Sequence, residues 1–198
     1  MSREIPTLMS TPMVRACLAG TKTQTRRLIR ECEPALPGLR RYEPGDILWI
    51  REPYRFPKCL DAKSARAIAA MCDDANYSRP WCPTRYEADG ATTDTDLFDS
   101  FTGPDGESAA WGKLRPSIFL PRWACRLFLR VEAVRVERLS TITEADAIAE
   151  GCPTQEWYRV PGGPEHWYRV LWDEINGARA PWDSNPWVFV VTFRKIEA

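Results

Sequence analysis

The chain has 198 residues, of which 44% are hydrophobic, and it carries 27 basic and 27 acidic residues. A chain of this size can bury its own core, and it has no apolar run of about eighteen residues, which excludes a membrane span. Met1 to Pro6 lack the apolar region of a signal peptide, and seven cysteines are an odd number for a complete disulfide framework. We therefore expect one reduced, cytoplasmic domain spanning residues 1–198.

Charge is distributed unevenly along the chain. Residues 1–55 hold 10 basic and 6 acidic groups, whereas residues 56–110 hold 5 basic and 10 acidic groups. Binding a long duplex by phosphate neutralisation normally needs a broad basic face. A neutral protein with a locally basic region is better suited to a modified nucleoside or a short single-stranded nucleic acid.

The N-terminal segment predicts three short elements. A strand is expected from Ile5 to Met9 and a helix over 11–19, with a proline at its first helical position. Gly20 supplies a left-handed C-cap for this helix. A strand over 24–30 follows, and the prolines and glycines of residues 31–45 indicate a surface connection.

The stretch from Gly20 to Arg27 concentrates an amine, three threonine hydroxyls and two guanidiniums where the helix passes into the strand. This density of hydrogen-bonding groups is typical of a binding or catalytic site. Lys22 and Thr25 are separated by an odd number of residues, so in a straight strand they would point to opposite faces. For these two side chains to converge, the chain from Gly20 to Thr23 must form a turn.

The middle of the chain predicts a buried strand followed by an acidic insertion. Residues 47–50 form an apolar run suited to a strand covered on both faces. Trp49 is a candidate base-stacking residue, and Arg51 with Glu52 can read the edge of a base, although a salt bridge at the strand end is the plainer interpretation. The insertion, at about 56–110, contains an expected helix over 62–71 and a polar stretch over 89–106.

Two kinds of side chain in and near the insertion have possible roles of their own. Tyr86 and Trp111 are candidates for a lid or a stacking contact. The insertion also has three cysteines, but it has no Cys-x-x-Cys pair, and His166 is the single histidine of the chain. We therefore expect neither a metal nor a cofactor.

The C-terminal third predicts two long strands and two helices. The alternation of apolar residues from 126 onward changes phase at Ala133/Val134, which indicates a β-bulge. Thr143 is an N-cap with Asp146 three residues on, and Glu150 falls in the last turn of that helix before Gly151. The second helix is expected over 164–176. Its apolar face is expected to consist of Trp167, Val170, Leu171 and Ile175. Residues 188–193 are then expected to form a buried central strand.

These elements together predict an α+β fold: a small closed or partly closed β-barrel with two or three flanking helices and an inserted elaboration. The spacing of Gly20, Lys22 and Arg27 matches Gly-x-Lys-x-x-x-x-Arg, and a second motif lies at 143–151. With the strand at 45–52 and an Asn-Pro-Trp ending, the chain resembles the ASCH domain family of the PUA-like superfamily, in particular its longer phage and prophage members. The resemblance implies a PUA-like fold.

The motifs are similar to those of a small bacterial member that hydrolyses N4-acetylcytidine. The resemblance implies that Thr25 attacks the acyl carbonyl, that neutral Lys22 accepts the hydroxyl proton, and that Glu150 exchanges a proton with the exocyclic nitrogen. The candidate substrate-binding residues are Gly20, Thr23, Arg26, Arg27, Trp49, Arg51 and Glu52.

Two other functions stay open at this point. One is a non-catalytic PUA-like module that holds RNA or modified DNA, and the other is a ribonuclease of the ASCH type. Each candidate catalytic residue also has a plain interpretation: Lys22 as a surface charge, Thr25 as a packing residue of a strand, and Glu150 as a solvated helix end.

Overall fold

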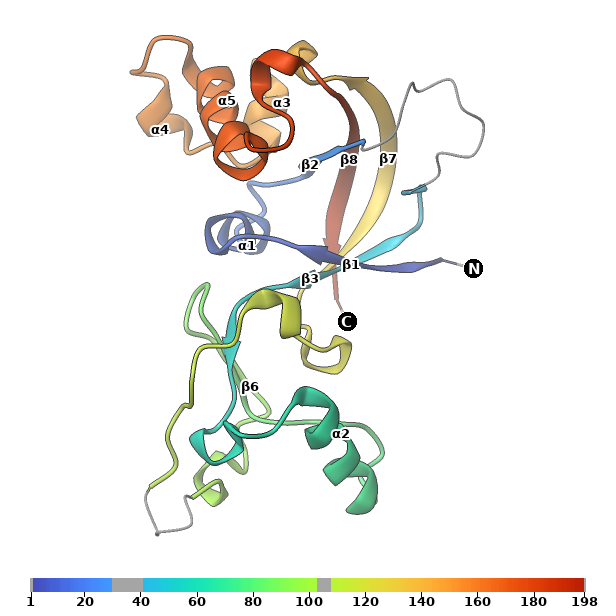
Figure 1. Ribbon diagram of the computed structural model, residues 1–198, viewed down its shortest axis with the longest axis vertical. Helices are drawn as coiled ribbons and strands as arrows, with labels where there is room; N and C mark the ends of the chain where they lie inside the picture. Colours follow the sequence, from blue (N-terminus) through green and yellow to red (C-terminus); the bar gives the residue numbers. More distant parts are fainter. Residues whose placement is uncertain (1, 30–40, 103–107, 198) are drawn as a thin grey trace. The chain divides into compact units, whose positions relative to one another are not determined.

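A computed structural model of the chain describes residues 2–29, 41–102 and 108–197. The described strands are β1 (Glu4–Leu8), β2 (Gln24–Leu28), β3 (Ile47–Arg51), β4 (Tyr54–Arg55), β5 (Thr84–Tyr86), β6 (Thr92–Thr93), β7 (Phe128–Arg138) and β8 (Trp187–Ile196) (Figure 1). The described α-helices are α1 (Thr11–Leu18), α2 (Ala65–Asp74), α3 (Glu144–Ala149), α4 (Thr154–Trp157) and α5 (Gly163–Asn176). None of these helices combines the length and the apolar character needed to cross a bilayer. Residue 30 of the second expected strand, most of the expected connection over 31–45 and part of the polar stretch over 89–106 lie outside the described residues.

The strands form one five-stranded and one three-stranded sheet. The larger sheet has the order β1-β3-β7-β8-β2, and the smaller has the order β4-β5-β6. β2 pairs antiparallel with β8, from Gln24 opposite Thr192 to Leu28 opposite Val188. β8 therefore has neighbours on both sides, which confirms the expected central strand, and Val188 and Val191 are fully buried.

The α+β class is confirmed, while closure of the sheet into a barrel stays a prediction, because the described order ends at β1 and β2. β7 is continuous through Ala133 and Val134, so the bulge also stays a prediction.

The chain divides into two compact units. The first contains residues 1–5, 16–48 and 129–197, and the second contains residues 6–15 and 49–128. The chain passes from one unit to the other within β1, α1, β3 and β7. The expected insertion at about 56–110 belongs to the second unit, and the organisation as a single domain stays a prediction.

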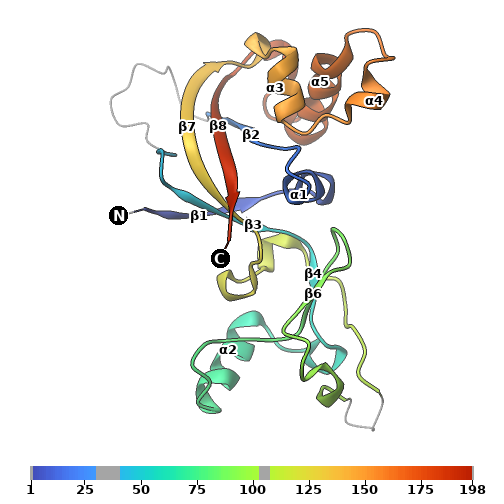
Figure 2. The ribbon, with the colours of Figure 1, turned by 180° about the vertical axis from the view of Figure 1, so that it is seen from behind.

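In the first unit, α3 packs on α5, and α5 packs on α4 (Figure 2). α3 begins at a capping box, as the sequence predicts: the Thr143 hydroxyl accepts from the Asp146 amide, and the Asp146 carboxylate accepts from the Thr143 amide. α3 ends at Ala149, and Gly151, directly after the C-cap residue Glu150, has a φ of 95°, a conformation that favours glycine. Local sequence therefore determines both ends of this short helix.

The buried face of α5 differs from the predicted one. Trp167 is buried as expected, but Tyr168 and Trp172 are buried beside it, whereas Val170 and Ile175 are 47% and 53% exposed. The physical reason is the size of the aromatic rings, which bury more apolar area than aliphatic side chains do. The helix therefore turns its aromatic face inward.

The second unit has its own core around Tyr54, Phe56 and Tyr86. The Tyr86 side chain is 1% exposed and its hydroxyl donates to the Ala124 carbonyl at 2.7 Å, so the lid interpretation of Tyr86 was wrong. Trp111 stacks on Phe98 with ring centroids 4.3 Å apart. Its indole face is therefore in contact with a ring of the protein itself.

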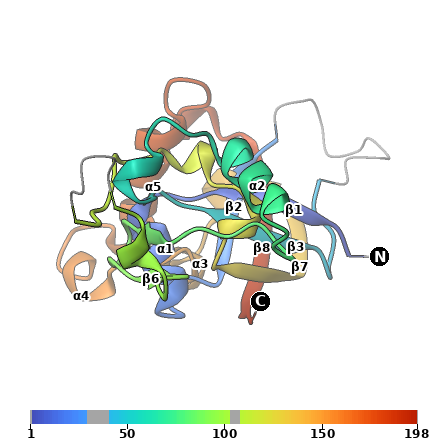
Figure 3. The same ribbon diagram turned by 90° about the horizontal axis from the view of Figure 1, so that it is seen from below.

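α2, in the second unit (Figure 3), begins three residues later than the sequence predicts. The Ser64 hydroxyl accepts from the Ala67 amide at 3.1 Å, which makes Ser64 the N-cap. Residues 62–64, which the sequence places in the first helical turn, instead belong to the connection between a 3-10 turn over Lys58–Leu60 and α2.

Candidate functional site

Gly20 starts the turn that the sequence requires between α1 and β2. Its φ is 75°, and the amides of Thr21 and Lys22 both donate to the Ala16 carbonyl, at 3.0 and 3.1 Å. The strand begins only at Gln24. Lys22 is therefore presented from a turn and not from a straight strand, as the catalytic hypothesis demands.

The C-terminal end of α3 lies directly against this turn. The Thr23 amide donates to the Ala149 carbonyl at 2.8 Å. Gly151 permits this close approach, because a Cβ at residue 151 would lie 3.1 Å from the Ala16 Cβ and 3.2 Å from the Lys22 Cβ. The two sequence motifs are thus in backbone contact.

Lys22 and Glu150 form a buried ion pair. The Lys22 Nζ lies 2.7 Å from Glu150 Oε2, and their side chains are 2% and 3% exposed. The same Nζ donates to the carbonyls of Gln24 at 2.7 Å and Glu150 at 2.9 Å. Each of the three ammonium protons therefore has an acceptor, which compensates for the removal of the charge from water.

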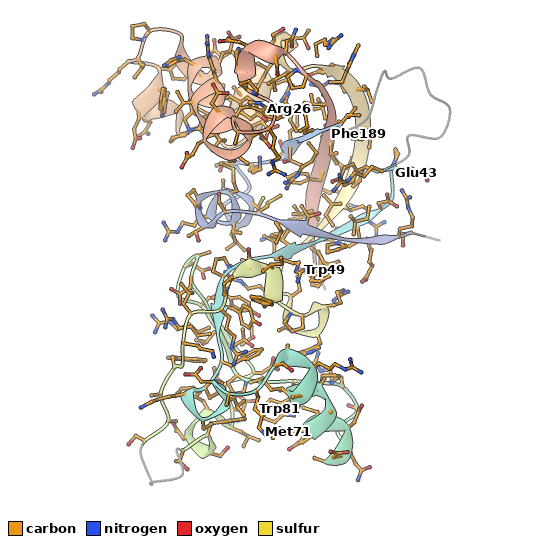
Figure 4. The ribbon with its side chains drawn as sticks, in the orientation of Figure 1. Arg26, Glu43, Trp49, Met71, Trp81 and Phe189 are labelled. Carbon is orange, nitrogen blue, oxygen red and sulfur yellow. The ribbon has the colours of Figure 1, made fainter. Side chains whose placement is uncertain are left out.

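Arg26 holds the second oxygen of Glu150. Its side chain is 0% exposed, and Nη1 lies 3.3 Å from Glu150 Oε1, while Nη2 lies 2.9 Å from Glu137 Oε1 and 3.0 Å from Asp146 Oδ2. Figure 4 shows Arg26 among the side chains near α3 and α5. In this structure the guanidinium binds protein carboxylates, so its expected contact with substrate stays a prediction.

Asp146 connects this cluster to β7. Its Oδ1 accepts from Gln24 Nε2 at 3.0 Å and from Arg135 Nη2 at 2.7 Å. Burial alone would raise the pKa of Asp146, but these two hydrogen bonds and the charge of Arg26 outweigh it and hold the pKa well below its usual range. The cluster thus contains three cations and three carboxylates, namely Lys22, Arg26, Arg135, Glu137, Asp146 and Glu150.

Thr25 is not part of this hydrogen-bonded cluster. It is 6% exposed, and it lies in β2 opposite Val191 of β8. Because side chains alternate along a strand, Thr25 and Arg27 leave β2 on the face opposite to Gln24 and Arg26. Among the described residues, neither Lys22 nor Glu150 makes a hydrogen bond with the Thr25 hydroxyl. The role of Thr25 as nucleophile stays a prediction.

Gly20 and Thr23, the remaining candidates in the turn, are both exposed. Their described contacts are made by the backbone: the Gly20 amide donates to the Cys17 carbonyl at 3.2 Å, and the Thr23 carbonyl accepts from the Phe193 amide at 2.9 Å. They shape the turn, and their contact with substrate stays a prediction.

Trp49, Arg51 and Glu52 belong to the second unit. The Arg51 guanidinium lies 5.4 Å from the centre of the Trp49 ring. Glu52 is fully buried and pairs with Arg126, which donates from Nε to Oε1 and from Nη2 to Oε2, both at 2.9 Å. The partner of Glu52 is thus Arg126 and not Arg51, which corrects the interpretation as a salt bridge at the strand end.

The second unit also contains a cavity of about 440 Å³. It is lined by Arg15 and by residues 85–90, and none of the predicted site residues is among them. In the ranges that the structure describes, no three His, Cys, Asp or Glu side chains are grouped so that they could hold a metal ion.

No family model matches the sequence, and no curated protein matches it. Among solved structures, the chain is similar to the crystal structure of protein EF3133 from Enterococcus faecalis V583, which carries the family-model description DUF984. The two sequences are 9% identical, and the TM-score is 0.43. The match covers 100% of this chain and 82% of that chain.

Two residues near the ion pair were not predicted from the sequence. Cys17 is 2% exposed, and burial raises the pKa of its thiol to about 11, while the smaller effects of the nearby charges are a lowering by Lys22 and a raising by Glu150. Tyr168 is 4% exposed, and burial together with the Glu150 charge raises the pKa of its hydroxyl well above the usual range. The signal for Tyr168 was weak, because an aromatic residue on a helix is most simply interpreted as core.

Proposed function

We propose that Lys22 and Glu150 form the active site of an ASCH-type hydrolase that removes an acyl group from a modified pyrimidine nucleoside such as N4-acetylcytidine. The observation that supports this proposal best is the 2.7 Å contact between an amine and a carboxylate that lie 128 residues apart in the sequence. Both groups are buried, so a proton that passes between them is shielded from bulk water.

The ion pair can supply both a base and an acid. Transfer of one proton from Lys22 Nζ to Glu150 Oε2 gives an amine and a carboxylic acid without a change in net charge. A substrate that displaces water from the site favours this neutral pair, because burial penalises separated charges. Lysine would then accept a proton from the nucleophile, and the acid would donate one to the leaving nitrogen.

The expected reaction has two steps. In the first, the Thr25 oxygen bonds to the acyl carbon, its proton passes to Lys22, and the bond to the exocyclic nitrogen breaks as Glu150 protonates that nitrogen. In the second, water cleaves the acyl-threonine ester, releases the carboxylic acid and restores the hydroxyl. This sequence requires the Thr25 hydroxyl to come within hydrogen-bonding distance of Lys22 when substrate binds.

A second candidate function is a non-catalytic PUA-like module that binds RNA or modified DNA. Its support is that all three protons of the Lys22 ammonium and both oxygens of Glu150 already have partners in this structure. A cluster whose charged groups all have hydrogen-bond partners without ligand can serve as a rigid base for a binding surface. Such a module is expected to bind nucleic acid more weakly as salt is added and to release no product.

Hydrolysis tests the two functions. Purified protein is incubated with N4-acetylcytidine, as the nucleoside and within a short single-stranded RNA, and cytidine is measured by mass spectrometry. We expect turnover that falls by at least about 100-fold in Lys22→Met, Thr25→Val and Glu150→Gln. Thr141→Val, which changes an exposed threonine of the same unit, is the matched control and should keep full activity.

Each result has a defined meaning. No turnover by the wild type, or full turnover by Thr25→Val and Lys22→Met, would exclude the hydrolase mechanism. Binding of the same ligands without turnover would favour the non-catalytic module. Cleavage of the RNA backbone that is lost in Lys22→Met would point to a ribonuclease.

A further inference from the structure

The cavity of the second unit is lined by two arginines and two carboxylates. Its volume is about 440 Å³, and its charged lining residues are Arg15, Arg85, Glu87 and Asp89. Cavities of this size hold small ligands in many proteins. Because none of the predicted site residues lines it, the kind of ligand has to be inferred from the charges of the cavity itself.

Both carboxylates of the lining are bound by arginines from outside it. Glu87 Oε1 lies 2.6 Å from Arg55 Nε. Asp89 accepts from Arg126 Nη2 at Oδ1 and from Arg126 Nη1 at Oδ2, each at 2.9 Å. The hydrogen bonds from Arg126 hold the pKa of Asp89 below its usual range and outweigh the opposing effect of burial. The negative charges of the lining are therefore compensated within the protein.

The two arginines of the lining have no such partner. Among the described residues, neither Arg15 nor Arg85 forms an ion pair, and both are exposed. Arg15 Nε donates to the Ala88 carbonyl, which leaves Nη1 and Nη2 without a described partner. A Cβ at Gly90 would lie 3.9 Å from Arg85 Nη2. Both guanidiniums are therefore located at residues 86–90, which line the cavity.

Arg85 also faces a like charge. In the pairing of β4 with β5 it lies directly opposite Arg55, an arrangement that destabilises a sheet, and Glu87 binds only Arg55. Around the cavity, four arginines and three carboxylates are connected in this way: Arg15, Arg55, Arg85, Arg126, Glu52, Glu87 and Asp89. The group has a net charge of +1, and the cations without a carboxylate partner are the two that line the cavity.

We infer that this cavity binds a terminal phosphate group, either that of a small phosphorylated molecule or that at the end of a nucleic-acid strand. Arginine donates through a planar fork that fits the oxygens of phosphate. A phosphate monoester carries a charge of about −1.5 to −2 at pH 7, which matches the two cations of Arg15 and Arg85, whereas a diester carries about −1. The inference does not rest on the proposed function, because the cavity contains none of the residues of that mechanism.

Calorimetric titration at pH 7 and constant ionic strength tests the inference. The probes are inorganic phosphate and CMP, and cytidine is the nucleoside without the phosphate. We expect Arg15→Gln and Arg85→Gln each to weaken the binding of both phosphate probes by about tenfold to hundredfold, the effect of a charged hydrogen bond. Arg66→Gln removes the same charge from an exposed arginine of the same unit outside the cavity, so this matched control should bind like the wild type.

The two sources of the phosphate are distinguished with a short single-stranded RNA, with and without a 5′-phosphate. Binding of the RNA that requires both the 5′-phosphate and the two arginines supports the inference with a strand end as the ligand. Binding of CMP alone, with the same dependence on the arginines, supports it with a small phosphorylated molecule.

Several results would overturn the inference. These are a wild type that binds neither phosphate nor CMP, equal binding by the wild type and both cavity variants, and an equal loss in Arg66→Gln, which would indicate unspecific attraction by charge. CMP binding that is lost in Lys22→Met and kept in both cavity variants would place the probe at the proposed active site and would also overturn it. Phosphate binding through the two arginines without hydrolysis of N4-acetylcytidine would refute the hydrolase and leave the inference intact.

Urea unfolding gives a second, independent measurement. Inorganic phosphate should raise the midpoint of the wild type above that in chloride at equal ionic strength, and it should not do so for the double variant Arg15→Gln/Arg85→Gln. Without phosphate, the midpoint of Arg85→Gln should be unchanged or higher, because the variant removes a like charge opposite Arg55. A clearly lower midpoint would show that the Arg85 guanidinium is bound within the protein, and that result would overturn the inference.

Discussion

Replacement of Lys22 by methionine should reveal how much the buried ion pair stabilises the fold. Methionine keeps most of the length of the side chain but has no donor, so the Gln24 carbonyl, the Glu150 carbonyl and Glu150 Oε2 all lose a partner. The carboxylate would keep Arg26 at 3.3 Å. Removal of one member of a buried pair costs about 3–5 kcal/mol of unfolding free energy, and we expect Lys22→Met to fall in this range.

Urea unfolding followed by circular dichroism measures this free energy. Lys195→Met changes an exposed lysine of the same unit and should cost less than about 0.5 kcal/mol. The double variant Lys22→Met/Glu150→Leu removes both charges, so it should be more stable than the sum of the two single changes implies. A cost below about 1 kcal/mol for Lys22→Met, or strict additivity in the double variant, would refute the reasoning.

Three further predictions test other features of the two units. Gly151→Ala places a Cβ at a φ of 95° and 3.2 Å from the Lys22 Cβ, so it should cost at least about 1–2 kcal/mol in urea unfolding, and an unchanged midpoint would contradict the close packing. Asp146 has a lowered pKa in the folded state, so its ionised form adds to the free energy of unfolding. This contribution is present above about pH 4 and is lost as pH falls through the folded-state pKa. The difference in urea midpoint between wild type and Asp146→Asn should therefore become smaller from pH 7 to pH 3. A difference that stays constant would contradict the lowered pKa of Asp146 in the folded state. Arg126→Lys loses the two-nitrogen contact with Glu52 and should lower stability by about 1–3 kcal/mol in the same assay, whereas wild-type stability would show that the paired geometry contributes little.

Sequence predicted the parts of the site that depend on local conformation. Gly20 and Gly151 adopt the positive φ values that their positions after helices imply, and Thr143 caps α3 as its motif indicates. These features depend on a few neighbouring residues, so a single sequence contains the information. The contact between the two motifs, by contrast, was expected from resemblance to a family and not from spacing.

The remaining contacts depend on residues far apart in the chain. Arg26 binds Glu137 and Asp146, more than 100 residues away, and no local pattern predicts these partners. Glu52 binds Arg126, 74 residues away, while the adjacent Arg51 looked like the simpler partner. The inward aromatic face of α5 was missed because hydropathy gives Tyr168 little weight. Such choices follow from packing and charge compensation in the folded chain.

The hydrogen bond from Lys22 to Gln24 has a consequence for how this protein behaves at high concentration. The Thr23 carbonyl faces β8, where it accepts from Phe193, so the next carbonyl along the chain, that of Gln24, faces away from the sheet. β2 is the last strand in the described order, and a strand edge without a neighbouring strand can pair with the backbone of another molecule. The Lys22 ammonium donates to the Gln24 carbonyl, which is the first acceptor on that strand edge. Its loss should therefore promote fibre-like stacking between copies of the chain, which light scattering would detect.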